Sequence, residues 1–148
     1  MVLRINESEH RNIDGFALAW RWTQDSHARF GESELASLVA LSPQKAESLR
    51  SELGDTPIEL HSSLQTGGKQ PSSVTDWLFS RLGNADDSLV ISWSDSLANI
   101  APAAVFAHRW DDFCYPSSDD VLVSAESQAW VLKYHHWEEF EWGIARDA

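Results

Sequence analysis

The last third of the chain carries the strongest constraint on the fold, because large apolar residues there alternate with polar ones. The apolar positions of this alternation are Trp130, Leu132, Tyr134, Phe140 and Trp142. Glu139 and Glu141 fall on the opposite side of the second segment. A period of two residues is typical of strands with one buried face. Together with a strand that begins at Val121-Leu122-Val123, these segments predict a C-terminal antiparallel β-meander.

Four other stretches show the spacing of three and four residues that is typical of helices with one buried face. The clearest begins after Ser42, a favourable N-terminal cap, with Pro43 in the first helical position and Gly54 as its stop. We also expect a shorter helix within 32–41 and later helices over 73–83 and 102–113.

Two more segments are expected to be strands. Residues 16–22, F-A-L-A-W-R-W, alternate strictly, although their alanines and leucine also suit a helix. The run L-V-I-S-W, residues 89–93, is nearly all apolar and predicts a central strand covered on both faces. Residues 55–73 are expected to be a loop. The whole pattern predicts an α+β fold, with about four helices packed on an antiparallel sheet of four or five strands.

Length and composition predict one globular domain over residues 1–148, because a chain of this size can bury most of its apolar surface. No apolar run reaches the roughly 20 residues of a membrane helix, and no secretory signal is visible. The single cysteine, Cys114, precludes a disulfide within the chain. We therefore expect a cytoplasmic protein that neither spans nor binds a membrane.

Acidic residues outnumber basic ones over the chain as a whole, and the imbalance is greatest near the C-terminus. The chain has 23 Asp and Glu against 11 Lys and Arg, a formal charge of −12. Between Trp110 and Trp142, eight acids face one base, Lys133. Such a field repels phosphate backbones, so no nucleic-acid partner is expected. It would attract a basic protein partner or a cation, while a purely solubilising surface is the alternative.

Aromatic and acidic residues are interleaved in W-D-D-F-C-Y and H-H-W-E-E-F-E-W, a pattern typical of interfaces with aromatic anchors and charged rims. We therefore expect a non-catalytic binding or inhibitory protein that uses an acidic, aromatic C-terminal face. The candidate binding residues are Asp111, Asp112, Asp119, Asp120, Trp137, Glu138 and Glu139. The same aromatic residues could instead be the inward-facing residues of strands, and a homo-oligomer is also possible.

The alternative hypothesis is a small metal-dependent hydrolase. His108 and Asp112 are one helical turn apart, and His135 and His136 could complete a ligand set of imidazoles and carboxylates. However, this spacing matches no recognised metal signature, so no cofactor is expected. Cys114 is a weak candidate nucleophile, because a helix C-terminus disfavours its thiolate and free cysteines are usually buried. No catalytic residue is assigned.

The segments W-D-D-F-C-Y-P-S-S-D-D-V-L-V, W-V-L-K-Y-H-H and F-E-W-G together resemble a bacterial protein family of unknown function. The resemblance covers about a quarter of the chain and implies a bacterial source but no activity. In its small size and acidic charge the chain is also similar to toxin-neutralising immunity proteins, which implies an inhibitory role.

Overall fold

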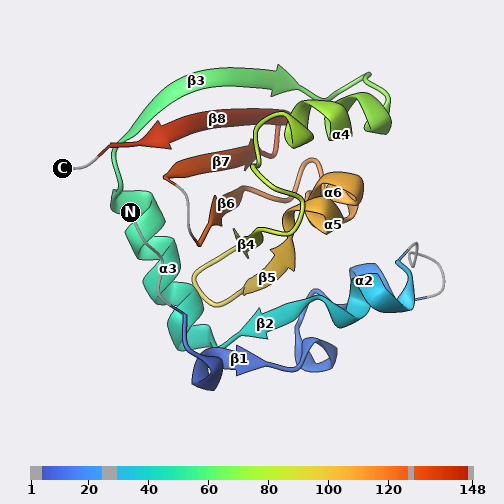
Figure 1. The fold of residues 1–148 in the computed structure, drawn as a ribbon, viewed down its shortest axis with the longest axis vertical. Coiled ribbons are helices and arrows are strands. Elements are labelled where there is room, and N and C mark those ends of the chain that lie inside the picture. Colours follow the sequence, from blue (N-terminus) through green and yellow to red (C-terminus); the bar gives the residue numbers. More distant parts are fainter. Residues whose placement is uncertain (1–4, 25–29, 127–128, 147–148) are drawn as a thin grey trace.

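The computed structural model describes residues 5–24, 30–126 and 129–146. These residues form one eight-stranded antiparallel sheet, with the order β1-β2-β5-β4-β6-β7-β8-β3 (Figure 1). The strands are β1 (His10–Arg11), β2 (Val39–Leu41), β3 (Ile58–Gln65), β4 (Ser88–Ser92), β5 (Ala98–Pro102), β6 (Val121–Ala125), β7 (Trp130–His135) and β8 (Glu139–Ala145). The expected meander is present as β6, β7 and β8, which pair in sequence order.

Helices cover both faces of this sheet, with α3 on one side and α4, α5 and α6 on the other (Figure 1). The α-helices are α1 (Trp20–Thr23), α2 (Glu32–Ala36), α3 (Pro43–Asp55), α4 (Pro71–Phe79), α5 (Ala103–His108) and α6 (Trp110–Phe113). Two short 3-10 helices, η1 (Glu7–Glu9) and η2 (Ile13–Gly15), lie near the N-terminal end. The α+β class is therefore right, but the expected four helices on four or five strands are too few for the described residues.

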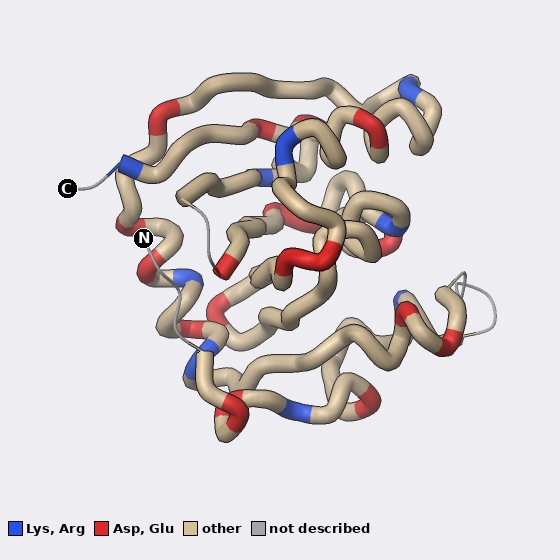
Figure 2. Tube along the Cα trace, viewed as in Figure 1, with Lys and Arg blue, Asp and Glu red and all other residues tan. Residues whose placement is uncertain are grey.

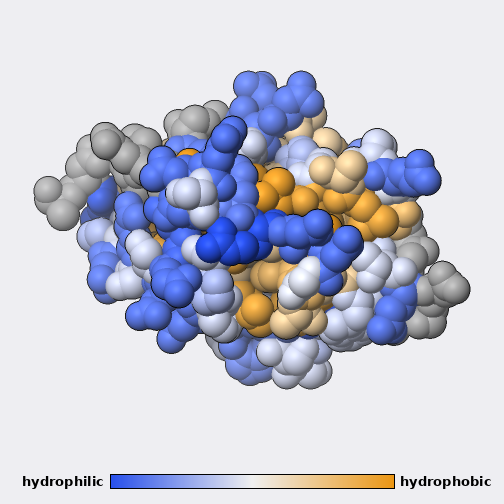
Figure 3. All heavy atoms as spheres, turned by 90° about the horizontal axis from the view of Figure 1, so that it is seen from below, coloured by the Kyte–Doolittle hydropathy of each residue, from blue (hydrophilic) through white to orange (hydrophobic). Residues whose placement is uncertain are grey.

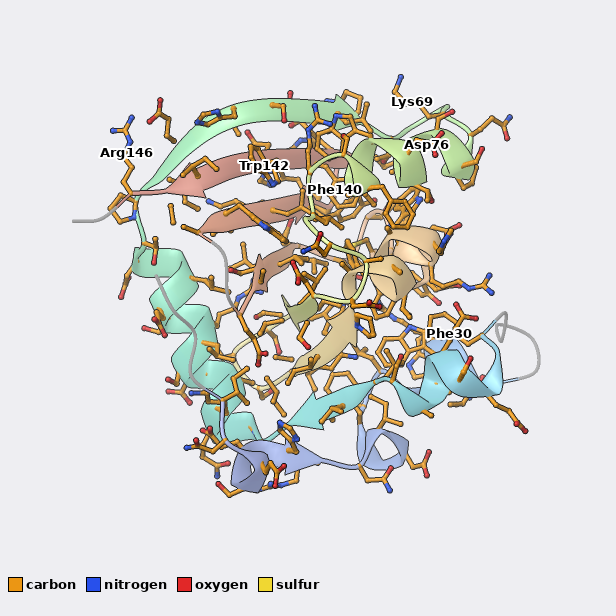
Figure 4. All side chains as sticks on the ribbon, viewed as in Figure 1. Phe30, Lys69, Asp76, Phe140, Trp142 and Arg146 are labelled. Carbon is orange, nitrogen blue, oxygen red and sulfur yellow. The ribbon has the colours of Figure 1, made fainter. Side chains whose placement is uncertain are left out.

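The larger hydrophobic core lies between the sheet and α4, α5 and α6. Strand residues that alternate along the chain reach this core, as the sequence pattern predicts. They include Leu89, Ile91, Val121, Val123, Trp130, Leu132, Tyr134 and Phe140. Phe140 and Trp142 are two residues apart on β8, so their side chains lie on the same face of the sheet (Figure 4). On the opposite face, α3 packs Leu49 against Val90 and Ile100, so the centre of the sheet is buried on both sides.

The helix α3 begins as predicted, because Ser42 Oγ accepts a hydrogen bond from the Lys45 amide at 3.2 Å and Pro43 occupies the first turn, but it continues through Gly54 to Asp55. The predicted strand over 89–93 is β4, in which Leu89 to Ser92 are buried and Ser88 is exposed.

Residues 16–22 do not form the expected strand. They form a turn followed by α1, in which Trp20 is exposed while Arg21 and Trp22 are buried. The alternating pattern gave the wrong prediction because Arg21 is buried in an ion pair with Asp119. This partner is distant in the sequence, so a local pattern could not predict the contact.

Three further predictions fail, two of them because of long-range strand pairing. Val39–Leu41 is a strand rather than the end of a helix, since it pairs with β5. Residues 58–65, expected as loop, form β3 at the sheet edge against β8. The helix expected over 102–113 is divided at Arg109, whose backbone leaves the helical region. In the described residues, no helix is long and apolar enough to cross a bilayer.

Candidate functional site

The turn between β7 and β8 presents an exposed tryptophan on a short, regular hairpin. His135 pairs with Glu139, which leaves the three-residue loop His136, Trp137 and Glu138. The Glu138 amide donates to the His135 carbonyl at 2.9 Å, and Glu138 itself has φ +68°. A tight turn followed by a left-handed residue is the usual three-residue hairpin, in which glycine normally takes the last position. Here a glutamate occupies this unfavourable conformation.

Two neighbouring loops hold the hairpin from either side. On one side, the amide and the hydroxyl of Thr66 both donate to the Glu138 carbonyl, at 2.8 and 3.0 Å. On the other side, the Ser117 amide donates to the His136 carbonyl at 2.9 Å. The His136 amide donates to Asp120 Oδ1 at 3.0 Å. The loop is therefore fixed by four hydrogen bonds to residues distant in the sequence.

Trp137 is 54% exposed, although its ring has defined neighbours. One face stacks on His135, with the ring centroids 4.3 Å apart and an interplanar angle of 4°. The His136 ring meets it edge-on at 5.1 Å. Its indole Nε1 donates to Glu139 Oε1 at 2.9 Å. A large aromatic ring held in one orientation loses little conformational entropy when it binds a partner.

Carboxylates surround this tryptophan. Glu141 Oε1 and His135 Nε2 are hydrogen-bonded, and Asp120 Oδ1 lies 3.1 Å from His136 Nδ1. Glu139 Oε2 accepts a hydrogen bond from Gln65 Nε2 at 3.1 Å. We name this surface the hairpin face and define it as Asp120, His135, His136, Trp137, Glu138, Glu139 and Glu141.

The electrostatics of the hairpin face keep Asp120 ionised to lower pH than usual. Desolvation raises the pKa of this carboxyl, but hydrogen bonds from the backbone and the ring of His136 outweigh it, so the pKa of Asp120 is lowered. The charge pattern of the chain does not single out this surface, because acidic residues also occur along α2 and α3 (Figure 2). What distinguishes the hairpin face is the exposed, fixed aromatic ring among its carboxylates.

The structure divides the seven candidate binding residues into two groups. Asp120, Trp137, Glu138 and Glu139 belong to the hairpin face. Asp111 is half-buried on α6, while Asp112 and Asp119 are buried.

The carboxylate of Asp119 is buried and bound by other residues of the chain. It accepts hydrogen bonds from Arg21 at 2.7 and 3.2 Å and from the Tyr115 amide at 2.8 Å. The polar stretch His108–Asp120 therefore mixes surface and interior residues, which its composition could not separate.

The metal-ligand candidates do not come together. His108, at the end of α5, packs edge-on against Phe79, with the ring centroids 5.1 Å apart. Asp112 is buried on α6, and His135 and His136 belong to the hairpin face. Within the described residues, no three His, Cys, Asp or Glu side chains form a group that could hold a metal ion. The geometry therefore gives the hydrolase hypothesis no support.

Cys114 is fully buried in the main core. Burial raises the pKa of its thiol well above the ordinary value, and the nearby Asp119 adds to this effect while Arg21 opposes it. A thiol held protonated and away from solvent is not suited to nucleophilic catalysis.

Sequence reasoning did not select Glu141, His135 or His136 as binding residues, and it considered the two histidines for catalytic or metal chemistry instead. The signal was present in the alternation of β8, which puts Glu139 and Glu141 on one side, opposite His135 and Lys133 of β7. The cross-strand register that brings these residues together could not be read from either strand alone.

Comparison with known proteins gives no match to any family model, curated protein or solved structure. The resemblances to a bacterial family of unknown function and to immunity proteins therefore remain predictions.

Proposed function

We propose that this protein is a non-catalytic binding or inhibitory protein that engages a basic protein partner through the hairpin face. The observation that carries the proposal is Trp137, which is 54% exposed yet stacked on His135 and hydrogen-bonded to Glu139. Tryptophan is the residue type most enriched among interface positions that dominate binding energy. The acidic residues around Trp137 fit a partner surface on which Lys or Arg side chains surround an apolar or cationic group that contacts the indole ring.

The rigidity of the loop supports this proposal. Four backbone-directed hydrogen bonds hold the hairpin, and Glu138 keeps a left-handed conformation that costs about 1–2 kcal/mol in a non-glycine residue. A non-glycine residue kept in such a conformation occurs more often at functional sites than elsewhere. A cytoplasmic location and an immunity-type role are further parts of the proposal, and they rest on the single buried thiol and on the small acidic chain.

The test begins with capture of partners from the cells that produce the protein, followed by purification of the partner and calorimetry. We expect Trp137→Ala to weaken binding by at least tenfold, which corresponds to about 1.4 kcal/mol. Charge removal at Glu139 and Glu141 should weaken it further and reduce its salt dependence.

The matched control removes two acids on α3, Glu47→Gln and Glu52→Gln, which are exposed but far along the chain from the hairpin. Binding should survive this control. A partner that tolerates Trp137→Ala, or that responds equally to both pairs of charge removals, would refute the proposal.

A further inference from the structure

A second surface, independent of the hairpin face, is hollowed beside the edge strand β1. The hollow has a volume of about 510 Å³. Its lining includes Arg11, Phe16, Ala17, Ala40, Pro43 and Leu97. A smaller hollow of about 420 Å³ adjoins it and shares Arg11 and Asn12. Figure 3 looks onto this side of the molecule and shows a hydrophobic patch crossed by hydrophilic residues. The volume is in the range of small-molecule sites.

The walls of the larger hollow are apolar and firmly supported. Phe16 stacks on Trp22, with the ring centroids 6.0 Å apart, and lies 5.7 Å from Trp93. Ala40 and Leu41 belong to β2 and are almost fully buried, and Leu97 packs against the main core. A ligand would therefore meet a preformed apolar surface with small side chains at its floor.

The rim of the hollow carries a cation without an acidic partner. Arg11 donates through Nη1 to the carbonyl oxygens of Ser8 and His10, at 2.8 and 2.7 Å. Among the described residues, no carboxylate forms an ion pair with it. Arg21, Arg109 and Arg146 are paired with acids, whereas Arg50 and Arg81, like Arg11, donate to carbonyl or hydroxyl oxygens. In a chain of charge −12, an arginine left without an acid is available for an external anion.

Two further features add to the polar character beside these walls. Pro43, the first residue of the 13-residue helix α3, lines the hollow, and the first turn of α3 contains no acid to offset the positive end of the helix. Asn99 is the cross-strand partner of Ala40, which in turn pairs with Arg11, so the three residues form one row. Asn99 is fully buried, and neither atom of its amide group has a partner. Asn99 is not among the residues that line the hollow, so its amide adds a polar group beside Ala40 and not in the hollow itself.

Asp14 lines the smaller hollow but not the larger one. It disfavours an anion there and restricts the anionic end of a ligand to the larger hollow. We propose that the larger hollow binds a small amphipathic carboxylic acid, with its apolar body against Phe16, Ala40 and Leu97 and its carboxylate on the Arg11 guanidinium.

The probes are octanoate and the uncharged 1-octanol. Their binding is measured from the shifts of backbone amide resonances in a nitrogen-15 correlation spectrum. We expect octanoate to bind saturably, with the largest shifts at residues that line the hollow. Arg11→Gln should weaken octanoate binding at least tenfold and leave 1-octanol binding unchanged, because only the charged contact is lost. Arg146→Gln, which removes a distant exposed arginine, should alter neither.

A blocking variant tests the place of binding. Ala17 is exposed and lines the hollow, so Ala17→Trp should fill the space without disturbing the core and abolish binding of both probes. If this variant does not give a folded spectrum, Ser96→Trp, at another exposed residue that lines the hollow, serves the same purpose.

Three results would overturn the proposal. They are an octanoate dissociation constant above about 10 mM, equal octanoate affinities for Arg11→Gln and the parent protein, and probe binding to the blocking variant. None of these outcomes bears on the hairpin face, so the two proposals stand or fall separately.

Discussion

Arg21 and Asp119 lie 98 residues apart in the chain and form a buried ion pair, with Nη1 and Oδ2 separated by 2.7 Å. The contact is bidentate, since Nη2 lies 3.2 Å from Oδ1. The guanidinium also covers the Tyr115 ring, 3.8 Å from its centroid. This pair joins α1 to the loop before β6, which in turn supports the hairpin face through Ser117 and Asp120.

Removal of one partner of this pair should be strongly destabilising, because it leaves an uncompensated buried charge. We expect Asp119→Ala to lower the free energy of unfolding by about 3–5 kcal/mol, measured by urea denaturation. The matched control is Asp120→Ala at the adjacent exposed position, where we expect a loss of about 1 kcal/mol or less. Similar losses of unfolding free energy at both positions would show that the buried ion pair contributes no more to stability than the exposed carboxylate does.

The left-handed conformation of Glu138 makes a stabilising substitution available. Glu138→Gly should raise the free energy of unfolding by about 0.5–1 kcal/mol, because the relief of backbone strain exceeds the entropy cost of glycine. Glu138→Ala removes the same side chain but keeps the strain, so it should not stabilise. Equal stabilities of the two variants, compared by thermal denaturation, would attribute any effect to the side chain instead of the backbone.

The buried thiol of Cys114 should be inert in the folded protein. Burial raises its pKa, and the core excludes reagents. We expect negligible reaction with a disulfide reagent such as dithionitrobenzoate in native buffer. The extent of fast labelling should rise with urea in parallel with the unfolded fraction. Rapid stoichiometric labelling without denaturant would contradict the buried position.

The pair between Glu34 and Arg109 should contribute a pH-dependent increment of stability. The Arg109 guanidinium donates to both carboxylate oxygens at 3.1 Å, and these hydrogen bonds lower the pKa of Glu34 below 4.5 despite partial burial. A carboxyl with a lowered folded-state pKa stabilises above its unfolded pKa, and the stability is lost as the pH falls through the folded value.

We therefore expect Glu34→Gln to lose about 0.2–1 kcal/mol at neutral pH and progressively less as the pH falls below about 4.5. The measurement is urea denaturation over this pH range. Glu47→Gln, at an exposed position of α3, provides the comparison and should show a smaller difference at neutral pH. A Glu34→Gln deficit that stays constant into acid would show that the carboxylate charge contributes nothing.

The sequence alone determined the elements whose cause is local. Ser42 and Pro43 specify the start of α3, the apolar run of β4 specifies a buried central strand, and the alternation around Trp130 and Phe140 specifies the meander. In the candidate site, the sequence identified Trp137 and its acidic neighbours, because a tryptophan in a charged turn has no local reason to be buried.

Only the tertiary structure decided the features that depend on pairing between distant residues. β2 is a strand because β5 supplies its hydrogen-bond partners, and its three residues are too few to show a period. β3 pairs with β8 at the sheet edge, although its apolar Ile58, Leu60 and Leu64 do alternate with polar residues, a period of two that the loop prediction overlooked. Asp119 and Asp120 are adjacent acids, yet Arg21 holds one in the interior while the other faces solvent beside His136. The physical reason is that burial of a charge requires a partner, and the position of that partner is a property of the fold.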